Sequence, residues 1–174
     1  MTGTTPADAP AMNRRRRLRI AVPIVAGIVV VDQLTKQWAL DALDDGHVIE
    51  VLPGLEFDLV FNSGFSFSAG SGNGPIIGAL VVALCAAMVW YLRRATAART
   101  VALVAVVLGG ALGNLLDRLF RADDGFMSGE VVDFIDVTWY AVFNVADIAV
   151  VCGAIALVAV EWWAGRDEPA ATDA

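Results

Sequence analysis

The sequence predicts an α-helical integral membrane protein with four transmembrane helices, a small extracytoplasmic β-hairpin or sheet, and a surface loop or helix. Hydrophobic residues make up 57% of the 174 residues, which is too many for an ordinary soluble domain. Four apolar stretches also approach the roughly 20 residues that a helix needs to cross a bilayer. They are Leu18 to Leu40, Pro75 to Leu92, Val101 to Phe120, and Val142 to Trp163.

These stretches fit one membrane domain over residues 18–165. The segments 1–17 and 166–174 contain too few apolar residues to pack, so we expect loose cytoplasmic tails there. The first span follows a basic run, as in a signal peptide, but no small-residue cleavage site comes after it. We therefore expect a retained anchor.

The basic residues predict the orientation of the spans. An even number of spans puts both termini on one side, and with the termini inside, nine of the twelve Lys and Arg residues are cytoplasmic. The other three, Lys36, Arg118 and Arg121, lie outward. The net charge of −7 gives no reason to expect a nucleic-acid partner. We expect a multi-pass protein of the cell membrane.

The segment between the first two spans has the pattern of a β-hairpin. From Leu55 to Asn62 hydrophobic and polar residues largely alternate, which is typical of a half-buried strand. Val48 to Leu52 precedes this run, and Pro53-Gly54 between them is typical of a turn. The hairpin should lie on the outer membrane surface.

The segment between the last two spans, residues 121–141, includes Val131 to Val137, which is too short and too charged to cross the membrane. We expect it to lie along the outer surface.

Several kinds of catalytic site are excluded by the residues that the chain lacks. Its single histidine, His47, lies between acidic and apolar surface residues, so neither a paired-histidine zinc site nor a serine triad is expected. Cys85 and Cys152 lie within apolar spans, where a thiol behaves as a small hydrophobic group. The glycines of the third span have no lysine-serine sequel and favour close helix packing over phosphate binding.

Polar clusters remain at the outer ends of the spans, where ionisable groups are costly and indicate function. They are Asp32/Lys36, Asn114/Asp117/Arg118, Asp133/Asp136 and Asn144/Asp147. Two carboxylates without metal ligands suggest the chemistry of aspartic proteases, in which a close pair shares one proton and activates water. That analogy requires two of these carboxylates to meet.

Structural interpretations of the same residues stay open at this point. Asn144 and Asp147 could be a helix N-cap and its third-residue partner. Asp32 and Lys36, four residues apart, could form a structural ion pair. Asn114 and Arg118 could join helices or bind loop carbonyls, and Asp136 could be a solvated surface acid.

The chain resembles the lipoprotein signal peptidases, or signal peptidase II family, from its first span to its fourth. Four blocks in this order carry the resemblance: Asp32-Gln33-Leu34-Thr35-Lys36, Phe61-Asn62-Ser63-Gly64 with Phe67-Ser68, the run Gly109 to Arg118, and Val132-Asp133-Phe134 followed by Phe143-Asn144-Val145-Ala146-Asp147. Each block alone is a weak signal, but their order and their placement relative to four spans are specific.

The resemblance implies a membrane aspartyl endopeptidase that cuts bacterial prolipoproteins just before the diacylglyceryl-modified cysteine. Asp133 and Asp147 would be the catalytic pair. Substrate-binding or supporting roles fall to Asn62, Asn114, Arg118, Asn144, Asp32, Lys36, Asp117 and Gly113. The resemblance implies no metal and no cofactor, and it places the site near the extracytoplasmic face of the inner membrane. Prolipoproteins and membrane lipids are the expected partners of a monomer.

Two departures from the family pattern concern loop shape and substrate preference. Phe65 stands where the family usually has a small residue, and the segment between Asp133 and Asn144 is short. The alternative function is a proton-coupled transporter with an intramembrane relay. The one-sided placement of the polar clusters argues against it, since a transporter needs polar groups near the midplane. A purely structural scaffold would leave the placement of Asp133 and Asp147 unexplained.

Overall fold

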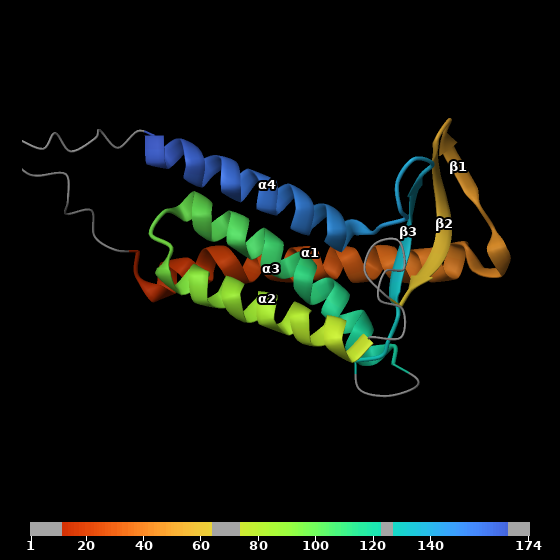
Figure 1. Cartoon of the computed structure of the whole chain (residues 1–174), viewed down its shortest axis with the longest axis horizontal. Helices are drawn as coiled ribbons and strands as arrows, with labels where there is room; N and C mark the ends of the chain where they lie inside the picture. Colours follow the sequence, from red (N-terminus) through yellow and green to blue (C-terminus); the bar gives the residue numbers. More distant parts are fainter. Residues whose placement is uncertain (1–11, 64–73, 123–126, 167–174) are drawn as a thin grey trace, which may run out of the picture.

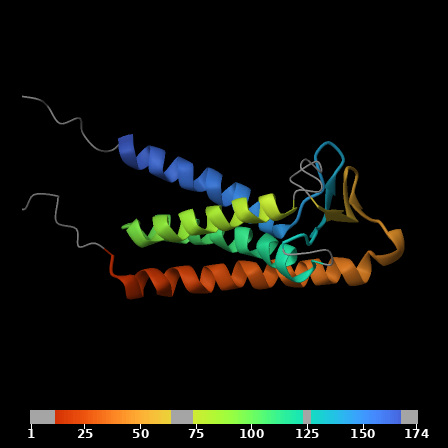
Figure 2. The same ribbon diagram turned by 60° about the horizontal axis from the view of Figure 1, so that its bottom comes forward.

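The structure, a computed structural model, describes residues 12–63, 74–122 and 127–166 and confirms the predicted fold class. Its four long helices are α1 (Arg14–Ala42), α2 (Gly74–Arg94), α3 (Ala98–Phe120) and α4 (Val145–Arg166). All four are long and apolar enough to cross a membrane. A small sheet stands at one end of the bundle, while the first residue of α1 and the last of α4 lie at the other end (Figures 1 and 2).

The helix boundaries differ from the predicted spans for local reasons. α1 begins at Arg14, so residues 14–17 belong to the helix and not to a loose tail. Asn13 explains this start, because its side-chain oxygen accepts a hydrogen bond from the Arg16 backbone nitrogen at 2.9 Å. α4 begins only at Val145, because Phe143 pairs with the sheet through a bridge to Ile135. The remaining tail residues, 1–11 and 167–174, lie outside the described residues.

α3 is the most buried of the four helices, and its glycines permit close packing. A Cβ atom at Gly110 would collide with the backbone oxygen of Ala146 at the start of α4. A Cβ atom at Gly113 would come within 2.5 Å of Oδ2 of Asp32 on α1. The predicted packing role of these small residues is therefore confirmed, and α3 brings the ends of α1 and α4 together.

The predicted hairpin is present as β1 (Ile49–Leu52) and β2 (Leu55–Asn62), which turn at Pro53-Gly54. Gly54 has a φ of 86°, a conformation that glycine adopts without strain. The short turn η1 (Asp44–Gly46) joins the hairpin to α1.

The expectation of a surface loop or helix at residues 131–137 was wrong, because this segment is a third strand, β3 (Val131–Val137). It pairs antiparallel with β2 in the order β1-β2-β3, with Asn62 opposite Val131 and Leu55 opposite Val137. Its residues 131–134 are buried. Rings of Trp38, Phe57 and Phe134 pack at centroid distances of 5.2 to 6.2 Å and connect the sheet to α1.

Three acidic residues lie side by side across the sheet. Glu56 on β2 is directly opposite Glu50 on β1 and directly opposite Asp136 on β3. Like charges at opposite positions destabilise a sheet. This acidic row, Glu50, Glu56 and Asp136, is separate from the polar network described next.

Candidate active site

The two aspartates singled out by the sequence come from different elements at the sheet end of the bundle. Asp133 lies on β3 and is only 1% exposed, whereas Asp147 lies in the first turn of α4 and is half-buried. Asn144, which is fully buried, stands just before α4 and contacts both.

Asn144 and Asp147 form a reciprocal capping box. Oδ1 of Asn144 accepts from the Asp147 backbone nitrogen at 3.0 Å, and Oδ2 of Asp147 accepts from the Asn144 backbone nitrogen at 3.3 Å. The capping interpretation is therefore confirmed, but capping is not the whole role of Asn144. Its side-chain amide also donates to Oδ1 of Asp133 at 2.6 Å. One residue thus caps a helix and bridges two carboxylates.

Two further asparagines complete the contacts of the aspartate pair. The amide of Asn62 on β2 donates to Oδ2 of Asp133 at 2.9 Å. The amide of Asn114 on α3 donates to Oδ1 of Asp147 at 2.8 Å. Each carboxylate therefore accepts a hydrogen bond at both of its oxygens, which fixes its position and its orientation.

Lys36 is the centre of a second part of the network, in which its own side chain and those of Asp32 and Asp117 are fully buried. Its Nζ lies 2.9 Å from Oδ2 of Asp32, 2.8 Å from Oδ2 of Asp117 and 2.9 Å from Oδ1 of Asn114. An ammonium has three N–H donors, so these three acceptors use all of them. The predicted Asp32–Lys36 pair is confirmed, and through Asn114 it is connected to Asp147.

Asp32 also caps α4, a contact that the sequence did not indicate. Its Oδ1 accepts from the Ala146 backbone nitrogen at 2.9 Å, where the first turn of a helix has unsatisfied donors. Gly113 has no side chain, and the carboxylate of Asp32 occupies the space that a Cβ atom at Gly113 would fill. α1, α3 and α4 therefore meet at Asp32.

Asp117 connects the network to the segment that carries Asp133. Its Oδ2 accepts from the Val132 backbone nitrogen at 3.3 Å, and its Oδ1 lies 3.1 Å from Nε of Arg121. Arg118 is 4% exposed and interacts electrostatically with Asp117, Asp133 and Asp147. All ten site residues from the sequence therefore lie in or against one cluster.

Sequence reasoning missed Gln33 and the ion-pair role of Arg121. The amide nitrogen of Gln33 lies 3.1 Å from Oδ1 of Asp117, 3.2 Å from Oδ2 of Asp32 and 3.2 Å from the Gly113 backbone oxygen. Gln33 belongs to the sequence block that begins at Asp32, and a polar side chain within a membrane span is itself a sign of a functional or structural contact. The contact between Arg121 and Asp117 could have been inferred, because Arg121 directly follows α3 and stands four residues after Asp117.

The environment of Asp133 favours its protonated form. Burial raises the pKa of this carboxyl to about 6, and the neighbouring charge of Asp147 acts in the same direction. The hydrogen bonds from Asn62 and Asn144 and the charge of Lys36 act against this shift. Asp133 is therefore poised to exchange a proton near neutral pH.

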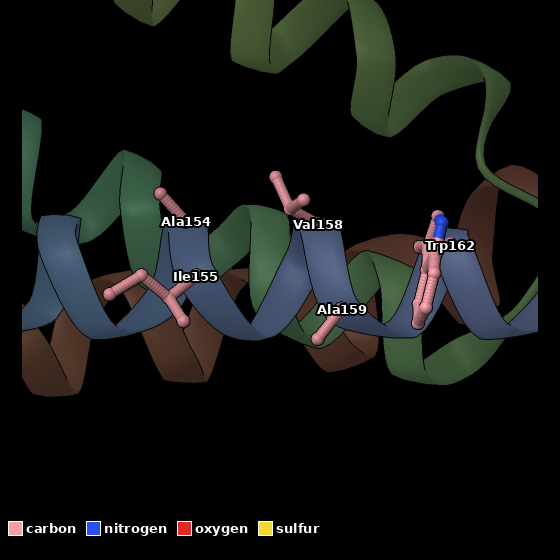
Figure 3. A pocket seen from close by; sticks show the side chains of 5 residues that line it. All are labelled: Ala154, Ile155, Val158, Ala159 and Trp162. Carbon is pink, nitrogen blue, oxygen red and sulfur yellow. The ribbon is translucent and has the colours of Figure 1, made fainter.

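The other residues considered in the sequence lie apart from this cluster. His47 is exposed, as expected, and within the described ranges no group of three or more His, Cys, Asp or Glu residues could hold a metal ion. Phe65 lies outside the described residues. A groove of about 470 Å³ on α4 is lined by Ala154, Ile155, Val158, Ala159 and Trp162 (Figure 3). Its lining is apolar, so the groove lacks groups for catalysis.

Comparison with known proteins gives one consistent answer. Residues 24–163 match the family model described as signal peptidase (SPase) II. A protein from Bifidobacterium adolescentis named lipoprotein signal peptidase is 43% identical over 151 residues, which cover 84% of this chain and 80% of that one. A protein of the same name from Mycobacterium avium is 38% identical over 159 residues, covering 90% and 85%.

Two solved structures described as bacterial membrane enzymes share the fold. The first has a TM-score of 0.74 at 23% identity and covers 88% of this chain and 94% of its own. The second has a TM-score of 0.69 at 26% identity and covers 81% and 91%. The family model and the named relatives, and not these two structures, favour the peptidase interpretation of the sequence over the transporter interpretation.

Proposed function

Since the chain belongs to the signal peptidase II family, membrane proteases that remove signal peptides from prolipoproteins, we propose that Asp133 and Asp147 are its catalytic pair. The observation that carries this proposal is the bridge through Asn144, which is hydrogen bonded to both residues. Asp147, Asn62 and Asn114 are only half-buried, so a peptide can approach the pair from their side.

The charges of the network favour one proton on the pair. Four carboxylates, those of Asp32, Asp117, Asp133 and Asp147, accompany three cations, those of Lys36, Arg118 and Arg121. Burying an excess charge is costly, so the cluster is closest to neutral when one carboxyl is protonated. Asp32 and Asp117 are ion-paired with Lys36, whereas the surroundings of Asp133 raise its pKa to about 6, so we place the proton on the pair Asp133 and Asp147. The two residues then titrate as one unit.

This state supplies both halves of peptide hydrolysis. The ionised aspartate removes a proton from water, which attacks the carbonyl carbon of the scissile bond, and the protonated aspartate donates to the carbonyl oxygen. Collapse of the tetrahedral intermediate then breaks the C–N bond. The first aspartate gives the proton it took from water to the leaving amine, and the second regains a proton from a hydroxyl of the intermediate, which restores the starting state of the pair. The amides of Asn62, Asn114 and Asn144 hold the carboxylates in place, and Arg118 can stabilise negative charge as it develops.

The substrate and its depth follow from the membrane setting. We propose that the bond cut precedes a diacylglyceryl-modified cysteine, whose acyl chains stay in the hydrocarbon and hold that bond at one depth. With both termini cytoplasmic, as the arginine distribution favours, the aspartates lie near the extracytoplasmic face. A monomer suffices, because one chain supplies every residue of the network, and residues 18–165 are the peptidase domain.

The test is cleavage of a lipidated prolipoprotein by the wild type, Asp133→Asn and Asp147→Asn, with a non-lipidated substrate alongside. Asp136→Asn is the matched control, because Asp136 is a carboxylate of the same strand that lies in the acidic row. We expect the wild type and the control to cut only the lipidated substrate, and both aspartate variants to fold but not to cut. Near-normal cleavage by either folded variant would contradict the catalytic pair.

A further inference from the structure

A dense group of arginines lies where α1 and α2 meet, at the end of the bundle opposite the sheet. This arginine junction consists of Arg14, Arg15, Arg16, Arg17 and Arg19 of α1 with Arg93 and Arg94 of α2. Six of the seven are exposed, and Arg17 is half-buried. Figure 1 shows the start of α1 and the end of α2 at the same end of the molecule. The active site does not use these residues.

A direct contact joins the two helices within the junction. The guanidinium of Arg17 donates to the backbone oxygen of Arg93 in the last turn of α2. This contact satisfies a carbonyl that has no partner within its own helix and brings the start of α1 against the end of α2, so the arginines of both helices gather in one place. A bound anion would offset the positive charge gathered there.

The position of the cations within α1 adds to the positive charge. The first turn of α1 contains four arginines and no acidic residue. The N-terminus of a helix carries a partial positive charge, so cations there are unfavourable and anions are favourable. The described part of α2 contains no acidic residue either. Among the described residues no carboxylate forms an ion pair with an arginine of the junction, although Glu161 of α4 is near enough to act on Tyr91 of α2.

The junction lies at the depth of lipid headgroups. The guanidinium of Arg94 stacks on the ring of Trp90, 4.4 Å from its centroid, and tryptophan prefers the membrane interface. A stacked guanidinium keeps its N–H groups at its edge, where they can donate to a phosphate. Apolar residues of both helices continue directly into the span, for example Leu18 and Val89, which are 42% and 36% exposed.

We propose that the arginine junction is a binding site for the phosphate headgroups of anionic phospholipids. Clusters of four to eight basic residues beside a transmembrane helix attract such lipids, and each arginine near the surface strengthens binding by about fivefold. The basic segment of a signal peptide is not a candidate ligand, because the positive charge of the junction would repel it. The site anchors this end of α1 and α2 to the lipid and is independent of the catalytic assignment.

The test measures binding of phosphatidylglycerol and phosphatidylcholine to the full chain by native mass spectrometry. Arg14→Gln/Arg94→Gln removes two charges from the junction. The matched control, Arg99→Gln/Arg166→Gln, removes two exposed arginines of α3 and α4 at the same end. We expect the junction variant to bind phosphatidylglycerol about 25-fold more weakly. The control removes the same charge outside the junction, so its loss should be clearly smaller, below about fivefold. Arg15→Gln/Arg16→Gln replaces the first variant if that one does not fold.

Three outcomes would overturn the proposal. Equal loss in the junction variant and the control means a diffuse positive field without a site. Equal binding of phosphatidylcholine means that the headgroup charge is not recognised. Displacement of phosphatidylglycerol by millimolar inorganic phosphate means that a free anion, and not a lipid, is the ligand.

Discussion

Lys36 on α1 and Asp117 on α3 form an ion pair with 2.8 Å between Nζ and Oδ2, and both side chains are fully buried. Breaking a buried ion pair by removing one partner costs about 3–5 kcal/mol, because the other charge stays buried without compensation. Here the removal of Lys36 would leave two carboxylates, those of Asp32 and Asp117, without their shared cation.

We therefore expect Lys36→Met to lower the free energy of unfolding by about 3–5 kcal/mol and to abolish cleavage. The control is Gln37→Met, an exposed position on the same helix, which should change stability little. Thermal unfolding in detergent measures both. A Lys36→Met protein that melts with the wild type would show that the ion pairs do not stabilise this fold.

Substitutions of Asn144 can separate its role as a helix cap from its hydrogen bond to Asp133. Serine keeps an N-cap oxygen but has no amide, whereas alanine has neither. We expect Asn144→Ser and Asn144→Ala each to slow cleavage by about 100-fold, because a donor to a catalytic carboxylate is lost. Only Asn144→Ala should also lose the capping contribution of about 1 kcal/mol. Equal unfolding temperatures of the two variants would mean that the cap is unimportant.

The pKa of Asp133 makes stability depend on pH. The folded protein holds this proton up to about pH 6, while an unfolded aspartate releases it near pH 3.9. Between these values the folded state binds more protons at Asp133, so the contribution of this residue to stability is fully present below about pH 4 and is lost as pH rises through about 6, by about 3 kcal/mol in total. Asp133→Asn cannot titrate.

Chemical unfolding at pH 4, 5, 6 and 7 tests this expectation. The difference in unfolding free energy between the wild type and Asp133→Asn should change across that interval in favour of the variant at the higher pH. A difference that does not change with pH means that Asp133 has the same pKa in both states.

Gly113 makes room for the carboxylate of Asp32, so Gly113→Ala should displace it from the Ala146 nitrogen. We expect a loss of about 1–3 kcal/mol in stability, as for other overpacked sites, together with reduced cleavage. Gly27→Ala is the matched control, because a Cβ atom at Gly27 meets nothing within 4 Å. That change should stabilise α1 by up to about 1 kcal/mol. A lower melting temperature of Gly113→Ala together with a higher one of Gly27→Ala supports the packing argument. Changes in the same direction in both variants refute it.

The acidic row offers a stabilising substitution. Glu56→Gln removes the central charge between Glu50 and Asp136, and we expect a gain of about 0.2–1 kcal/mol per relieved pair. Asp58→Asn serves as the control, because Asp58 lies in the irregular stretch between Phe57 and Val60, outside the paired register. The gain should shrink at high salt, because Glu50 is exposed and Glu56 and Asp136 are only half-buried, so their charges are screened. No gain in stability at low salt would mean that the three carboxylates do not repel one another measurably in the folded protein.

The sequence predicted the elements whose signals are local. Apolar length identified four spans, alternation and Pro53-Gly54 identified the hairpin, and the motif blocks identified the polar residues. β3 was not predicted, because its partner strand β2 is about 70 residues away in the sequence, where Asn62 lies opposite Val131. The charges of Asp133 and Asp136 also indicated a surface segment, since the buried partners of Asp133 come from distant parts of the sequence.

The roles of individual site residues were harder to predict than their membership of the site. Asp32 caps a helix that begins more than 100 residues later, and Asn144 acts as cap and bridge together. Neither role follows from spacing along one helix, because each depends on how α1, α3 and α4 meet. The contacts of Gln33 depend on the same meeting point.

The ion pair within α1 bears on how the chain enters the membrane. α1 is synthesised first, so Lys36 reaches the lipid before α3 supplies Asp117 and Asn114. Asp32, one turn earlier on the same helix and 2.9 Å from Nζ, gives the lysine a counter-charge during that interval. An isolated charge at that depth would oppose insertion. Asp32 therefore allows the nascent helix to insert alone, and the same carboxylate later completes the assembled bundle by capping α4.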